Sequence, residues 1–208
     1  MSLYGSIDLH SNNSYVMISD EEDKIIKEKR LPNRLDEIDR FFKEHKEGLS
    51  DIVVESTFNG YWLLDGLKDL GYPTKLVHVA ACKQYAGLKY TDDSSDCMWL
   101  NRMNRLGVIP EGYIYPRQDR TIRDLLRKRL YLVQTRSGLV IALKQQFLSW
   151  NALAVTKDDL YELTPENLKA LVVEEPLRCQ MESYLEIIRV LNERIKIMES
   201  LIHQKAKQ

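Results

Sequence analysis

The first half of the chain switches between two spacings of apolar residues. Apolar residues at every second position, separated by polar turns, predict three strands over residues 3–9, 15–18 and 24–31. The segments that follow are predicted as helix, strand, helix and strand, over residues 33–47, 51–55, 62–70 and 74–79. Strands joined by short turns pair antiparallel, whereas strand–helix–strand units pair parallel. The pattern therefore predicts an α/β fold with one mixed five-stranded sheet and flanking helices.

The second half has only helical spacing. One long helix is predicted from Arg117 to about Trp150, a short one opens at Thr164 and Pro165, and the last begins at Pro176. In that last helix apolar residues recur four and three apart: Leu177, Met181, Tyr184, Ile188, Leu191, Ile195, Met198 and Ile202. Such a heptad seam favours a coiled coil, and hence a homodimer formed through residues 177–202. The alternative is an antiparallel hairpin with the preceding long helix.

These patterns predict three segments. Residues 1–115 form the α/β core, residues 116–164 an arginine-rich helical extension, and residues 165–208 the C-terminal coiled-coil helices. Charged residues make up 29% and hydrophobic ones 44%, as in ordinary folded proteins. Three cysteines without CxxC spacing indicate reduced thiols rather than disulfides or a zinc site. With no signal-peptide layout and no membrane-length apolar run, we expect a cytoplasmic protein without a membrane partner.

Two aspartates at the start of the next predicted helix are the first candidates for chemistry. Asp93 and Asp96 stand three apart, so on a helix they share one face, with Cβ atoms roughly 5–6 Å apart. Two carboxylates at this distance repel each other unless a cation lies between them. The alternative is structural, with Asp93 as the N-cap and Asp96 as the third residue of a helix cap.

Two further acids stand at positions that are unusual for acids. Asp8 lies inside the first predicted strand, where aspartate is disfavoured, and Glu55 closes the strand at 51–55. The structural alternatives are an edge position in water for Asp8 and a helix-capping loop position for Glu55. The predicted order of strands and helices is that of the ribonuclease-H-like fold, in which acids at these places and on a later helix converge. Four convergent carboxylates favour Mg²⁺ or Mn²⁺, and two ions about 3.5–4 Å apart would clamp a phosphodiester.

Four sequence segments resemble the DEDD transposases of bacterial insertion sequences and the related pilin-gene invertases. They are Gly5–Ser11, Val53–Thr57, Thr91–Asp96 and Leu106–Pro116. The resemblance covers roughly residues 3–150 and implies a RuvC-like nuclease domain with Asp8, Glu55, Asp93 and Asp96 as catalytic metal ligands. It also implies DNA as partner, both element ends and target, and a structured guide RNA. Members carry a further C-terminal domain with a nucleophilic serine, so we expect this chain, which ends at Gln208, to be a truncation.

A strongly basic segment follows the acids. Residues 102–136 contain nine basic and three acidic side chains, a net charge of +6 in a chain whose overall charge is −1. Arginine binds phosphate through its bidentate fork, so this segment is a candidate nucleic-acid interface. The residues we expect to contact the backbone are Arg117, Arg120, Arg123, Arg127, Lys128 and Arg129. The alternative is a solvated helix face without a partner.

The sequence therefore predicts an enzyme: the N-terminal domain of a DNA transposase or site-specific recombinase that uses Mg²⁺ for strand cleavage and transfer. The alternative is a nucleic-acid-binding or regulatory transposase fragment without chemistry of its own. Sugar kinases and actin-like ATPases share the core fold but need a glycine-rich phosphate loop after the first strand. Leu9–Asn13 contains no glycine, which argues against that class.

Overall fold

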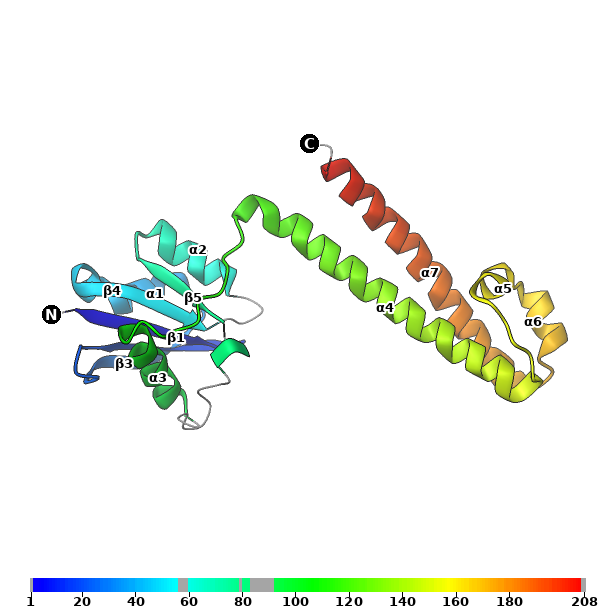
Figure 1. Cartoon of the computed structure of the whole chain (residues 1–208), viewed down its shortest axis with the longest axis horizontal. Coiled ribbons are helices and arrows are strands. Elements are labelled where there is room, and N and C mark those ends of the chain that lie inside the picture. Colours follow the sequence, from blue (N-terminus) through cyan, green and yellow to red (C-terminus); the bar gives the residue numbers. More distant parts are fainter. Residues whose placement is uncertain (1, 56–59, 79, 83–91, 207–208) are drawn as a thin grey trace. The chain divides into compact units, whose positions relative to one another are not determined.

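The computed structural model describes residues 2–55, 60–78, 80–82 and 92–206 (Figure 1). The chain divides into two compact units, Met1–Ile114 and Tyr115–Gln208. The predicted loop after Glu55 and the predicted strand end at Val79 lie outside the described residues. A separate boundary between residues 164 and 165 stays a prediction.

The first unit is built on one mixed sheet. Its strands are β1 (Leu3–Leu9), β2 (Asn13–Ser19), β3 (Ile25–Pro32), β4 (Leu49–Glu55) and β5 (Thr74–Val77), in the spatial order β3-β2-β1-β4-β5. β1 pairs antiparallel with β2 and parallel with β4, and β5 pairs parallel with β4. This confirms the predicted ribonuclease-H-like α/β arrangement, with β1 in the centre of the sheet.

Helices cover both faces of this sheet. α1 (Leu35–Phe42) and α2 (Tyr61–Asp69) pack on the face that carries Ile7, Val16 and Ile52. α3 (Asp93–Arg105) packs on the opposite face, where Leu100 and Met103 contact Val53 and Val77. Since successive strand residues point to opposite faces, Asp8 and Glu55 lie on the same side as Val53, beneath α3.

The helix predicted over residues 33–47 is shorter than expected. α1 begins at Leu35, and after Phe42 the chain tightens into a 3-10 helix over Lys43–Gly48 that buries no residue. Without an apolar face to pack, this charged stretch has nothing to hold a regular α-helix against the sheet. Arg34 is the N-cap of α1 and makes no side-chain cap hydrogen bond, while the amide of Asn33 donates to the carbonyl oxygens of His10 and Ser11.

The second unit is helical, and the long helix is confirmed. It comprises α4 (Arg117–Asn151), α5 (Lys157–Glu162), α6 (Pro165–Leu171) and α7 (Glu175–Lys205). Thr156 caps α5 and Thr164 caps α6, each accepting a backbone N–H three residues on. α4 and α7 run antiparallel, since Arg129 contacts Glu199 while Arg136 donates to Asn192 at 2.7 Å.

The heptad seam of α7 faces its own chain. Met181, Leu185 and Ile188 are buried together with Leu143 and Phe147 of α4. This is the hairpin that the sequence left open as the alternative to a coiled coil between two copies. A homodimer formed through residues 177–202 stays a prediction. Among the described residues, none of the helices is long and apolar enough to cross a membrane.

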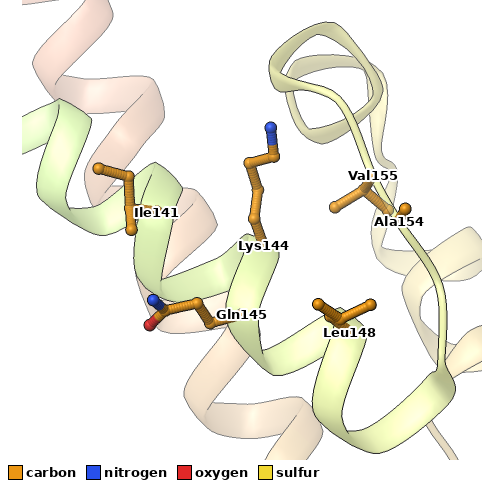
Figure 2. A pocket seen from close by; sticks show the side chains of 6 residues that line it. All are labelled: Ile141, Lys144, Gln145, Leu148, Ala154 and Val155. Atoms are coloured by element: carbon orange, nitrogen blue, oxygen red, sulfur yellow. The ribbon is translucent and has the colours of Figure 1, made fainter.

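A pocket of about 350 Å³ lies on the second unit, beside the C-terminal part of α4 (Figure 2). It is lined by Ile141, Lys144, Gln145, Leu148, Ala154 and Val155. Its lining is mainly apolar and includes no carboxylate, so this pocket is unsuited to hold a hard divalent cation.

Candidate functional site

Asp8 lies at the carboxyl end of the central strand. Its backbone pairs with Tyr15 of β2, and the preceding residue, Ile7, pairs with Val54 of β4. Asp8 is only 5% exposed, so the expected alternative of an edge position in water is wrong. A carboxylate this deeply buried needs a partner or a proton, because an isolated buried charge is strongly disfavoured.

Glu55 reaches the same edge of the sheet from the neighbouring strand. It is the last residue of β4, directly after Val54, and is half-buried. Because β1 and β4 run parallel, their carboxyl ends meet at one edge, which is where such sheets collect functional residues. The Glu55 side chain lies within hydrogen-bonding reach of Asp8, a contact that needs a proton on one of the two carboxyl groups.

The helix cap of α3 is formed by a residue other than the two expected. Asp92 is the N-cap: its carboxylate accepts the backbone N–H and the hydroxyl of Ser95, each at 2.8 Å. The predicted alternative, a cap formed by Asp93 and Asp96, is therefore wrong. Asp92 satisfies the helix end, and Asp93 and Asp96 lie in the first turn of α3.

Polar contacts fix α3 over the sheet along its length. In the middle, the hydroxyl of Ser6 donates to the carbonyl oxygen of Cys97 at 2.9 Å. Near its C-terminal end, Asp23 contacts both Arg102 and Arg105. These contacts set where the first turn of α3 lies relative to Asp8.

A buried polar cluster also holds the C-terminal end of α3. Lys75 Nζ lies 2.7 Å from Asp51 Oδ2 and 3.1 Å from Asn104 Oδ1. The amide of Asn104 in turn donates to Asp51, and both side chains are almost fully buried. The cluster joins β4, β5 and α3 without involving any of the four candidate acids.

The structure brings two of the four predicted acids, Asp8 and Asp93, together with His10, and Glu55 and Asp96 lie close enough to act on the pKa of Asp8. The pKa of Asp8 is raised, first by burial and further by the negative charges of Asp93 and Asp96. The interactions of Asp8 with His10 and with the Glu55 side chain act in the opposite direction, toward a lower pKa. Asp8 therefore interacts with each of the other three acids, across more than eighty positions of sequence.

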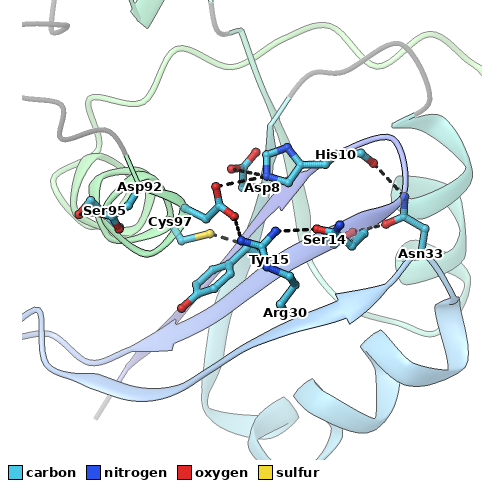
Figure 3. Close-up of polar contacts among 11 residues, drawn as sticks. Asp8, His10, Ser14, Tyr15, Arg30, Asn33, Asp92, Ser95 and Cys97 are labelled. Atoms are coloured by element: carbon cyan, nitrogen blue, oxygen red, sulfur yellow. Dashed lines mark hydrogen bonds and ion pairs between the residues drawn. The ribbon is translucent and has the colours of Figure 1, made fainter.

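His10 belongs to this site, and the sequence reasoning missed it (Figure 3). Its Nε2 lies 3.4 Å from Asp8 Oδ2 and 3.4 Å from Asp93 Oδ1. One ligand atom from each of the three residues lies within 4.8 Å of the others, the spacing of a metal-binding group. The available signal was its position two residues after Asp8, directly after the end of β1.

These residues fit a divalent cation. The oxygen donors of four carboxylates would form a hard ligand set that suits Mg²⁺ and Mn²⁺, and a histidine nitrogen beside them suits Mn²⁺ better than Mg²⁺. The raised pKa of Asp8 shows that burial and neighbouring charge disfavour the ionised site by itself. A bound cation would remove this repulsion.

The predicted basic interface lies at the start of α4, in the second unit. Arg117, Arg127 and Lys128 are exposed. Arg120 Nε donates to the carbonyl oxygen of Tyr115 at 2.7 Å, and the Arg123 guanidinium stacks 4.4 Å above the Tyr115 ring. These residues thus group around one helix start.

Arg129 differs from the other predicted interface residues. Its guanidinium contacts the carboxylate of Glu199 on α7. Part of the positive charge predicted for nucleic acid is therefore already paired within the chain.

Comparison with known proteins agrees with this arrangement. No curated protein gives a match. The family model of the IS110-type DEDD transposases, described as a transposase, matches residues 6–150. Because that match spans more than half of the chain, the protein belongs to the IS110-type DEDD transposases.

Proposed function

We propose that this chain carries the nuclease domain of an insertion-sequence transposase that cleaves and joins DNA strands with the help of Mg²⁺ or Mn²⁺. The proposal rests on one observation: buried Asp8, His10 and Asp93 have ligand atoms within 4.8 Å of one another at one edge of the sheet, the edge at which Glu55 ends β4. Asp8, Glu55, Asp93 and Asp96 would hold one or two divalent ions. Such ions supply Lewis-acid stabilisation of the attacking and leaving oxygens of a phosphodiester.

The chain's own residues have separate roles in this proposal. Asp8 and Glu55, on rigid neighbouring strands, provide fixed ligands, whereas Asp93 and Asp96 come from the first turn of α3. α3 covers this face of the sheet and limits water access to the buried carboxylate of Asp8. The basic start of α4 would bind DNA or guide-RNA phosphates, and copies of the chain would associate in the bacterial cytoplasm.

Metal binding is the first test. Calorimetry of the full chain with Mn²⁺ should show binding that Asp8→Ala and Glu55→Ala each weaken strongly. The charge-matched control is Glu47→Gln, since Glu47 is exposed on the 3-10 helix after α1. Equal binding by the wild type and both alanine variants would refute the metal site.

Nucleic-acid binding is tested by salt dependence. Each phosphate contact that is lost should reduce the slope of log K against log salt by about 0.9 for duplex DNA. Arg127→Gln and Lys128→Gln should each show this reduction. The matched control is Arg129→Gln, two residues on in the same helix, because Arg129 already contacts Glu199. An unchanged slope in all three variants would favour a solvated helix face.

A second function is favoured by one observation. Arg30 already places positive charge beside Asp93, so part of the acidic charge is balanced by the protein itself. A nucleic-acid-binding transposase fragment without chemistry would have this property. DNA binding that persists in Asp8→Ala, with no Mn²⁺ binding by the wild type, would support this alternative.

A further inference from the structure

The edge strand β3 reaches the first turn of α3 through two side chains. Arg30 Nη2 donates to Asp93 Oδ2, and Glu28 Oε2 accepts the hydroxyl of Ser94 at 2.6 Å. Arg30 and Glu28 are two apart, so they lie on the same face of the strand. We call these two pairs of residues the β3–α3 latch (Figure 3 shows the Arg30 side).

Residues of the neighbouring strands contact the Arg30 and Glu28 side chains of the latch. Asp8 pairs with Tyr15, and Tyr15 pairs with Arg30, so the three residues form one row across β1, β2 and β3. The Arg30 guanidinium lies 5.6 Å from the Tyr15 ring, and Tyr15 donates to Glu28 Oε2 at 2.9 Å. Arg30 Nη1 also donates to Asn13 at 2.8 Å. Besides Asp93, the guanidinium thus contacts the Tyr15 ring and the Asn13 side chain.

The two oxygens of Asp93 face different partners. Oδ1 lies 3.4 Å from His10 Nε2, on the side of Asp8, whereas Oδ2 contacts Arg30. Asp93 Oδ1 can therefore bind a cation that Asp8 also binds, while Oδ2 keeps its contact with the Arg30 guanidinium. Hydrogen bonds to the second oxygen of a metal-binding carboxylate fix its orientation, and removing such a partner typically weakens metal binding 10–100-fold.

We infer that Arg30 is a positioning residue of the metal site, which directs Asp93 Oδ1 toward Asp8 by holding Oδ2. This inference rests on the proposed function, since it takes Asp93 as a metal ligand. Arginine remains charged at every pH at which the protein is folded, so the contact needs no change of protonation. Arg30 acts through Asp93 and does not itself touch the cation.

The direction in which the Mn²⁺ affinity changes when Arg30 is removed distinguishes a positioning role from simple charge balance. If Arg30 only neutralised the acids, its removal would strengthen Mn²⁺ binding, because a positive charge next to a cation site repels the cation. If Arg30 orients Asp93, its removal weakens binding in spite of the lost repulsion.

The experiment is Mn²⁺ calorimetry on the full chain, with the melting temperature in EDTA measured for every variant. Arg30→Ala should raise the Kd for Mn²⁺ at least 10-fold, and Arg30→Lys, which lacks the fork, less. Lys29→Ala removes the same charge from the opposite face of β3 and should leave the Kd within about 2-fold. Ser94→Ala, which breaks the other half of the latch without a change of charge, should weaken binding several-fold.

Each outcome decides one point. An unchanged or lower Kd in Arg30→Ala, with wild-type binding that Asp8→Ala removes, would overturn the positioning role and leave the proposed function standing. Wild-type protein that binds no Mn²⁺ would overturn both. If Arg30→Ala does not fold, Arg30→Lys and Ser94→Ala decide, and wild-type affinity in both would overturn the inference.

Discussion

Replacing Asp8 by asparagine should stabilise the metal-free protein, although it removes a proposed ligand. The change keeps the size of the side chain and removes one negative charge from a site where Asp8, His10 and Asp93 have ligand atoms within 4.8 Å. Two unit charges at that distance repel by about 3.5 kcal/mol at an effective dielectric constant of 20. His10 and the hydrogen bond to Glu55 offset part of this repulsion, so we expect a net gain of roughly 1–2 kcal/mol at neutral pH.

The pH dependence of this gain has a defined sign. Burial raises the pKa of Asp8 above its ordinary value of 3.8, so the native state binds that proton more tightly than the unfolded state. The resulting stability is present at low pH and is lost as pH rises through the raised pKa. Asp8→Asn lacks this titration. Its advantage over the wild type should therefore be small near pH 4 and grow toward neutral pH.

Urea unfolding in EDTA would measure the effect. A Trp150→Phe background leaves Trp62 and Trp99 as reporters, both in the first unit. With Mn²⁺ at 100 times its Kd, the wild type should gain about 2.7 kcal/mol and Asp8→Asn almost nothing, so their order reverses. Glu47→Gln is the control. A variant less stable than wild type in EDTA at pH 7 would refute the reasoning about repulsion.

Three other predictions concern the supports of the site and the second unit. Lys75→Met should lower the free energy of unfolding in urea by about 2–3 kcal/mol, because Asp51 is left without its cation. The loss should be smaller than the roughly 3–5 kcal/mol of a fully buried pair, since Lys75 is partly exposed. An unchanged free energy of unfolding would refute a stabilising role for the pair. Burial raises the pKa of Cys97 to about 12, so its thiol should not react at pH 8. Iodoacetamide at that pH should modify exposed Cys179 and leave Cys97 unmodified in peptide mass spectrometry. Equal labelling of the two cysteines would contradict this prediction. Phe147 is fully buried, so Phe147→Ala should destabilise the α4–α7 hairpin by about 3–5 kcal/mol. Thermal unfolding followed by circular dichroism would measure this loss. A change below about 1 kcal/mol would contradict the packing of Phe147 in the hairpin.

The sequence predicted the sheet correctly and singled out four acids whose role as metal ligands stays a prediction, and both inferences depend on local signals. The alternation that marks β1 also makes Asp8 conspicuous, and the order of strands and helices places Glu55 beside it. The expected cap at Asp93 was wrong because three aspartates compete for the role, and only the position of the first turn shows that Asp92 takes it. The preference of aspartate for the N-cap position does not tell which of several neighbouring aspartates takes that position.

Arg30 could not be predicted with the same means. Arg30 reaches Asp93 only through the register that places Asp8, Tyr15 and Arg30 in one row, and register depends on turn geometry as well as on pattern. The heptad seam of α7 was ambiguous for a related reason. A helix with a 4–3 apolar stripe packs equally well on its own chain or on another copy, and the choice depends on whether α4 lies within reach.

The way in which α3 is fastened has a consequence for measurements with salt. Asp23, Arg30 and Lys75 hold this helix through charged contacts that are partly exposed, and mobile ions screen such contacts. Raising the ionic strength therefore loosens the support of two proposed ligands at the same time as it releases nucleic acid. A salt titration of DNA binding or cleavage on this protein contains an intramolecular contribution, which repeating the titration at constant Mn²⁺ occupancy would separate.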